Sequence, residues 1–71
     1  MFISEEKLKE LREEYPTGIK IVLIYMDDIQ APKPGTHGTV INVDDAGHIH
    51  VKWECRSSLA LIPGIDKFKK Y

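Results

Sequence analysis

The sequence lacks most of the features that mark a compartment. Cys55 is the only cysteine among the 71 residues, so no disulfide can form within the chain, and a reducing setting suits it best. No apolar run approaches the length that spans a bilayer, and the first residues lack the positive start and long apolar segment of an export signal. We therefore expect a soluble, cytoplasmic protein with no membrane association.

Signatures of catalysis are missing as well. The sequence has no recognisable nucleophile with a base and an orienting group, no phosphate-cradling glycine loop and no zinc-ribbon spacing. Neither sign of charge is in excess, because 10 Lys and Arg residues stand against 11 Asp and Glu residues, for a net charge of -1. We expect a protein that is not an enzyme and uses no cofactor, and its composition does not favour nucleic acid as a partner.

What is present is a pattern of short apolar segments, consistent with a single domain over residues 1–71. A core of this size is only marginally sufficient without disulfides, metal or a partner. A short amphipathic helix is predicted over residues 3–15, where Ser4 can cap its start and Pro16 and Gly18 follow its end. Its apolar stripe consists of Leu8, Leu11 and Tyr15. A helix this short is unstable alone in water, so the stripe must pack on the rest of the domain.

Residues 18–71 read as β structure. The first strand, residues 19–26, is apolar on both faces, so Val22, Ile24 and Met26 need a cover, and the helix stripe is the nearest candidate. Prolines and a glycine in residues 27–37 predict an ordered, exposed loop.

A hairpin follows this loop. Asp44-Asp45-Ala46-Gly47 places Asp where a turn needs a side-chain acceptor and Gly where the left-handed conformation is required. Beyond the turn, Ile49, Val51 and Trp53 alternate with polar residues, so one face of that strand is buried. Val40 and Val43 are three residues apart, which predicts a bulge in the preceding strand.

Two further segments complete the expected fold. Residues 59–62 are predicted as a fourth short strand, residues 63–66 as a turn, and the lysine-rich tail as a last short strand. The pattern predicts a mainly β fold, a small SH3-like five-stranded barrel with a short N-terminal α-helix, and a small open sandwich is the alternative.

A series of short motifs follows in order along most of the chain: Tyr15-Pro16-x-Gly18, Tyr25-Met26-Asp27-Asp28, Pro34-Gly35-Thr36, Gly38-Thr39-Val40, Val43-Asp44-Asp45-x-Gly47, Ile49-His50-Val51-x-Trp53 and Ser58-Leu59-x-Leu61-Ile62-Pro63-Gly64-x-Asp66-x-Phe68. Together these motifs resemble the uncharacterised bacterial family domain of unknown function 4314. The resemblance implies a small SH3-like β domain of Gram-positive bacteria, their phages and conjugative elements, with no established activity or catalytic residues.

The chain departs from the family pattern after Trp53. The family usually has an acidic residue followed by Asn-Gly, whereas Glu54 is followed here by Cys55-Arg56. Cys and Arg fit poorly at the positive φ angles of a two-residue hairpin turn. We therefore expect either a longer turn at this point or a strained one.

Candidate partner-binding residues lie at the hairpin and at the entrance of the long loop. His48, His50 and Lys52 are expected on one face of a strand, beside a loop that begins with Asp27 and Asp28. His48 and His50 have the spacing of two metal ligands, but no third ligand has suitable spacing, so no metal site is predicted. The carboxylates are expected to accept backbone hydrogen bonds or to contact a partner.

The tail carries the only basic and aromatic cluster of the sequence. Lys67, Lys69, Lys70 and Tyr71 are the candidate nucleic-acid-binding residues, because aromatic rings beside lysines bind single strands. The alternative reading is that Phe68 fills the core while the lysines stay in solvent. One short cluster on a nearly neutral domain favours that alternative.

The leading functional hypothesis is a non-catalytic interaction module that binds another protein, or a second copy of itself, through the long loop and the neighbouring strand surface. The family resemblance implies an accessory role in a phage, prophage or conjugative element. A nucleic-acid-binding SH3-like barrel is the alternative, and a metal-dependent enzyme is the second alternative.

Overall fold

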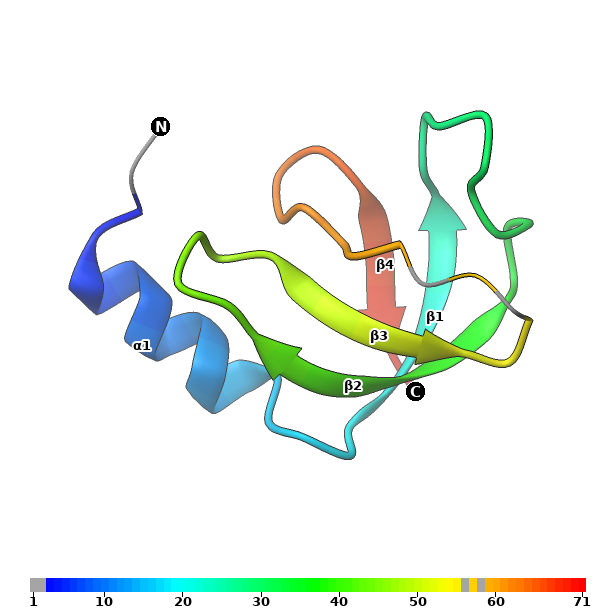
Figure 1. The fold of residues 1–71 in the computed structure, drawn as a ribbon. Helices are drawn as coiled ribbons and strands as arrows, with labels where there is room; N and C mark the ends of the chain where they lie inside the picture. The colour runs from blue at the N-terminus through cyan, green and yellow to red at the C-terminus, as the bar shows by residue number, and fades with distance from the viewer. Residues whose placement is uncertain (1–2, 56, 58) are drawn as a thin grey trace.

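The computed structural model describes residues 3–55, 57 and 59–71, and it consists of one helix and one sheet. The elements along the chain are α1 (Glu5–Glu14), β1 (Lys20–Tyr25), β2 (His37–Val43), β3 (Ile49–Trp53) and β4 (Lys67–Lys70). The four strands are antiparallel and lie in the order β3-β2-β1-β4. In Figure 1, β1 and β4 run across the direction of β2 and β3, which shows how strongly the sheet twists.

The predicted mainly β class is confirmed, but the sheet of the described residues is not closed into the predicted five-stranded barrel. The segment expected as a fourth strand is reduced to one bridge, in which Ile49 and Leu61 exchange backbone hydrogen bonds of 2.9 and 2.8 Å. Pro63 cannot donate to a longer ladder, and the N–H of Ile62 donates to the Asp66 carboxylate at 2.8 Å instead. The chain therefore turns away from β3 after this bridge and continues to β4.

Helix α1 begins and ends close to the predicted limits of residues 3–15. The Ser4 side chain accepts a hydrogen bond of 3.1 Å from the backbone N–H of Lys7, as a helix cap does. At the other end, the N–H of Tyr15 donates to the carbonyl of Leu11 at 2.8 Å before Pro16 interrupts the pattern.

The helix does not cover the side chains that the sequence assigned to it. Of the strands, α1 contacts β2 and not β1, so the prediction that it lies over Val22, Ile24 and Met26 is wrong. The reason lies in the connection after the helix, because the Thr17 hydroxyl and the Gly18 N–H both bond carbonyls of β2. Tied to β2 in this way, the helix lies beside the turn between β2 and β3 (Figure 1). The outer face of β1 is left uncovered.

Gly47 shows how closely the helix approaches that turn. Its φ of +84° is the left-handed conformation predicted from the sequence, and its N–H donates to the Asp44 carbonyl at 2.9 Å. A Cβ atom added at Gly47 would lie 2.7 Å from the Cδ1 atom of Ile3 and 3.6 Å from that of Leu11. The predicted bulge is confirmed as well, since the register between β2 and β3 shifts between Val40 and Asn42.

The core is formed by one face of the sheet, the helix stripe and the bridge segment. Its buried side chains are Leu11, Ile21, Leu23, Val40, Val43, Ile49, Val51, Trp53 and Leu61. Trp53 is 3% exposed and pairs with Gly38 across β2 and β3, so it packs as the alternation predicted. Its indole N–H donates to the Leu59 carbonyl at 2.9 Å, which satisfies the one polar group of the ring.

Replacing Leu11 with Ala should destabilise the domain by about 2–4 kcal/mol, because the Leu11 side chain of the helix is buried in the core. Urea denaturation followed by circular dichroism measures this change. Leu8→Ala is the matched control and should cost less, since Leu8 is only partly buried. An unchanged midpoint for the Leu11 variant would show that the helix is not part of the cooperative fold.

Gly38→Ala should destabilise the domain by about 1–3 kcal/mol, because the added carbon would lie 2.5 Å from Val51 Cγ1 and 2.8 Å from Trp53 Cε3. Thr39→Ala, at the next position but on the other face of β2, serves as the control. The emission of Trp53 reports the local repacking, and the urea midpoint reports the stability. Equal midpoints for the two variants would contradict this account of the core.

Candidate functional site

The turn between β2 and β3 is organised by the carboxylate of Asp44. Its Oδ1 atom accepts backbone hydrogen bonds from Ala46 at 3.0 Å and His48 at 2.9 Å. Its Oδ2 atom lies 2.8 Å from Nε2 of His50. The bond to His50 is the main reason that the pKa of Asp44 is lowered, the two backbone N–H groups act in the same direction, and partial burial opposes them. His50 therefore has a structural role in the turn.

The predicted partner-binding residues lie at two different ends of the sheet. His50 pairs with Asn42 near the end of β2, and His48 precedes β3 at the same end. Asp27 and Asp28 follow β1, beyond the point where Val22 pairs with the start of β2. Lys52 is exposed between these two ends. The structure does not bring the histidines and the loop carboxylates into one surface patch.

The long loop, residues 26–36, is ordered by hydrogen bonds at both of its ends. At its start, Asp28 accepts from the Gln30 N–H at 2.7 Å through its side chain and from the Ala31 N–H at 3.0 Å through its carbonyl. At its end, the Gly35 N–H donates to the Leu23 carbonyl at 2.7 Å, and the Leu23 N–H donates to the Thr36 carbonyl at 2.9 Å. The loop is thus a fixed extension of β1.

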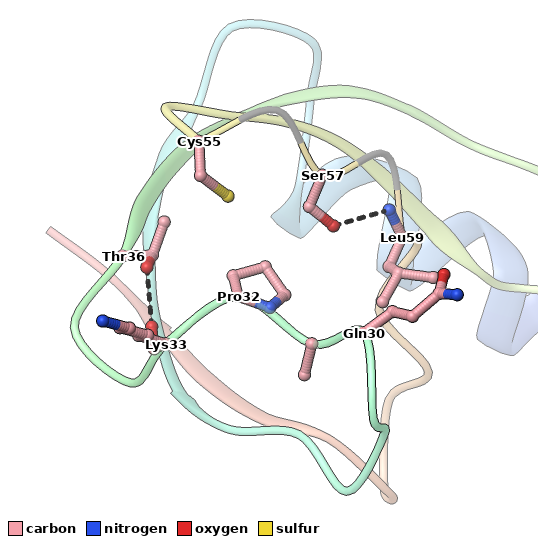
Figure 2. A pocket seen from close by; sticks show the side chains of 8 residues that line it. Gln30, Pro32, Lys33, Thr36, Cys55, Ser57 and Leu59 are labelled. Atoms are coloured by element: carbon pink, nitrogen blue, oxygen red, sulfur yellow. Dashed lines mark hydrogen bonds between the residues drawn. The ribbon is translucent and has the colours of Figure 1, made fainter.

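A groove of ≈ 530 Å³ opens between this loop and the segment that follows β3. Its lining residues are Gln30, Ala31, Pro32, Lys33, Thr36, Cys55, Ser57 and Leu59. Figure 2 shows the sulfur of Cys55 and the hydroxyl of Ser57 turned toward the space above Pro32. Pro32 is buried, and the Thr36 hydroxyl donates to the Lys33 carbonyl at 2.6 Å, so the loop side of the groove is fixed.

Apolar side chains are exposed at the same end of the molecule. Ile24 is 46% exposed and Tyr25 is 53% exposed, and Ile29 lies entirely in solvent. The register between β1 and β4 shifts between Leu23 and Tyr25, which turns the end of β1 outward. The sequence analysis missed Ile29 as a candidate. Ile29 stands in the sequence between two aspartates and a proline-rich segment. A loop of this composition has few apolar residues to bury an isoleucine, so its exposure could have been predicted.

The lysine-rich tail is divided between the two faces of β4. Lys70 points toward the helix, where its Nζ atom is 3.9 Å from Glu14 and 5.0 Å from the centroid of the Tyr15 ring. Phe68 packs on the core, with its ring centroid 5.5 Å from that of Tyr15. Lys67, Lys69 and Tyr71 are exposed.

Within the described residues, no group of three or more His, Cys, Asp or Glu side chains is placed to hold a metal ion. The longer or strained turn that is predicted at Cys55-Arg56 involves Arg56, which lies outside the described residues. No helix among the described residues is long and apolar enough to cross a membrane.

The described residues form a small, mainly β domain with one N-terminal helix and a four-stranded antiparallel sheet. The chain belongs to the family described as "Domain of unknown function (DUF4314)", which matches residues 4–71. No curated protein and no solved structure matches the chain. The family resemblance of the motifs is thereby confirmed.

The stability of the domain should fall in acid partly through Asp44. Because the pKa of Asp44 is below 3.8 in the folded protein, its stabilising effect is present above pH 3.8 and is lost as the pH falls through the lowered pKa. The carboxylate is 36% exposed, so solvent screens it and we expect about 1 kcal/mol or less. Asp44→Asn should therefore be less stable near about pH 6 and should lose less stability between about pH 6 and about pH 3.

Urea midpoints at several pH values test this expectation. Asp45→Asn is the matched control, because Asp45 bonds Arg12 at 2.9 Å but its side chain is 99% exposed. The control should lose as much stability in acid as the wild type. An equal acid loss in the Asp44 variant would show that the turn does not depend on this charge.

Proposed function

We propose that this domain is a non-catalytic interaction module that binds another protein through the end of β1 and the long loop. The observation that supports it most is the exposure of Ile24, Tyr25 and Ile29 on a backbone that is already fixed. A partner that buries these side chains orders little new backbone, so less entropy is lost on binding. Aromatic side chains such as that of Tyr25 are among the residues that contribute most to protein interfaces.

The charges beside the exposed side chains indicate the chemistry of the partner. Asp27 and Asp28 flank Ile29 on its N-terminal side, and both are exposed. A partner with an apolar pocket and a basic rim would complement this surface. A symmetric dimer through the same loop would place the carboxylates of two copies near one another, which disfavours self-association at this point. The groove of Figure 2 lies beside the loop and can receive an extended segment of the same partner.

A second proposal concerns the class of fold. We propose that the sheet is an opened SH3-like barrel, in which the bridge at Leu61 lies on the free edge of β3 and β4 lies on the edge of β1. Residues 62–66 connect these two edges, as the closing turn of a barrel would. The biological setting that we propose, an accessory role in a phage, prophage or conjugative element, rests on the family to which the chain belongs.

Ile29→Asp should abolish capture of the partner without affecting folding. The tagged domain would be incubated with a lysate of the bacterium that carries it, and bound proteins would be quantified by mass spectrometry. Ile65→Asp is the matched control, because Ile65 is 69% exposed in the turn before β4. Both changes affect exposed side chains and should alter stability by no more than about 0.5 kcal/mol.

The proposal predicts that at least one protein is captured by the wild type and the Ile65 variant and is lost with the Ile29 variant. Identical captured proteins for all three forms would overturn it. Sedimentation of the purified domain provides the second readout. A dimer that the Ile29 change dissociates would replace the proposed partner with a second copy of the chain.

A further inference from the structure

The charged residues of the sheet are of one sign. The four strands carry lysines and, among their described residues, no aspartate or glutamate. The eleven acidic residues of the chain lie on the helix and in the loops and turns. The strand lysines are Lys20, Lys52, Lys67, Lys69 and Lys70. The net charge of -1 therefore conceals a separation of charge between the sheet and the rest of the chain.

The register of the strands places three of these lysines on the uncovered face of the sheet. Lys20 lies opposite Thr39, and Thr39 lies opposite Lys52, so their side chains share one face across β1, β2 and β3. The Nζ atom of Lys20 donates to the Thr39 hydroxyl at 3.1 Å. Lys69 lies opposite Val22, two residues along β1 from Lys20, and so joins the same face.

Two aromatic rings lie among these lysines. His37 pairs with Val22 at the start of β2, and just after β4 the backbone N–H of Tyr71 donates to the Lys20 carbonyl at 3.3 Å. The two rings stack, with centroids 4.3 Å apart and planes inclined by 32°. Tyr71 remains 60% exposed. We call Lys20, His37, Lys52, Lys69 and Tyr71 together the lysine face.

We propose that the lysine face binds single-stranded nucleic acid. Lysines along a sheet can contact successive phosphates, and an exposed aromatic ring can stack on an unpaired base. The tyrosine and histidine are side chains that RNA-binding sheets use for such stacking. Glu54, beside His37 at the edge formed by β3, is close to this face, through a backbone bond of 2.9 Å to His37. The Asp44 carboxylate lies beside this face as well, because it is 2.8 Å from Nε2 of His50, which is on the same side of β3 as Lys52.

This surface adjoins the protein-binding surface of the proposed function at Ile24, which lies on the same side of β1 as Lys20, but it does not include the long loop. Ile29 and the loop carboxylates lie beyond the end of β1, whereas Lys20 begins that strand. Nucleic acid, unlike an acidic peptide, supplies both the phosphates for the lysines and flat bases for the Tyr71 ring. The pairing of cations with a stacked aromatic pair thus favours a single strand over other polyanions.

The test measures the fluorescence anisotropy of a labelled oligo-dT of about ten nucleotides. This length is within the range that single-strand-binding OB folds cover. The wild-type domain should bind it at about 50 mM salt, with a slope of log affinity against log salt of roughly -2 for three phosphate contacts on a single strand. Replacing Lys20, Lys52 and Lys69 together with Gln should remove most of that slope and lower the affinity at least about ten-fold. Tyr71→Ala should lower the affinity about five-fold or more through the loss of stacking.

Three controls make the outcome decisive. Lys7, Lys9 and Lys33 replaced together with Gln remove the same charge from other exposed positions and should bind as the wild type does. Ile29→Asp should also bind normally, so failure of the loop proposal and failure of this one are distinguishable. A labelled polyglutamate peptide should bind more weakly than oligo-dT.

Several results would overturn the proposal. The first is that the folded wild type does not bind oligo-dT at low salt. The second is that the two triple lysine variants lose the same amount of affinity. Binding of a DNA duplex as tightly as the single strand, with no effect of the Tyr71 change, would show non-specific attraction to phosphate only.

Discussion

The packing of Trp53 against Gly38 is the contact on which the rest of the sheet depends. The two residues face each other across β2 and β3, and the absence of a side chain at Gly38 leaves space for the indole ring. The same ring donates its N–H to the Leu59 carbonyl at 2.9 Å. Leu59 stands two residues before Leu61, which forms the bridge to Ile49. One side chain thus fixes β2, β3 and the segment after β3, and Leu59 in turn lines the groove beside the long loop.

A second constraint acts at the other end of the hairpin. Asp44 holds the turn through two backbone N–H groups and His50, and the turn presents Gly47 to the side chains of Ile3 and Leu11. The helix is too short to be stable alone, so its attachment depends on the shape of this turn. A polar network thereby positions an apolar contact. This explains why His50, which alternation places on the solvent side of β3, serves the fold as well as the surface.

The sequence predicted those parts of the structure that local rules determine. Ser4, Pro16 and Gly47 have one physical role each, and the helix limits and the turn followed from them. Closure of the barrel was mispredicted because it depends on how far residues 59–62 pair with β3, which Pro63 and Asp66 decide together. The position of the helix was mispredicted. The apolar residues of β1 predict that some element packs on them, but they do not identify which element it is.

The surfaces were the least predictable part, because they combine residues that are distant in sequence. His50 was expected to lie beside the loop that begins with Asp27, but the antiparallel register carries the two residues to different ends of the sheet. Lys20, Lys52 and Lys69 come together only once three strand pairings are known. Net charge was misleading for the same reason. At physiological salt a charge is screened within about 8 Å, whereas the domain extends 31 × 24 × 17 Å, so a bound strand would experience mainly the lysines of one face. Opposing charges on the helix and in the turns bear on solubility more than on binding at that face.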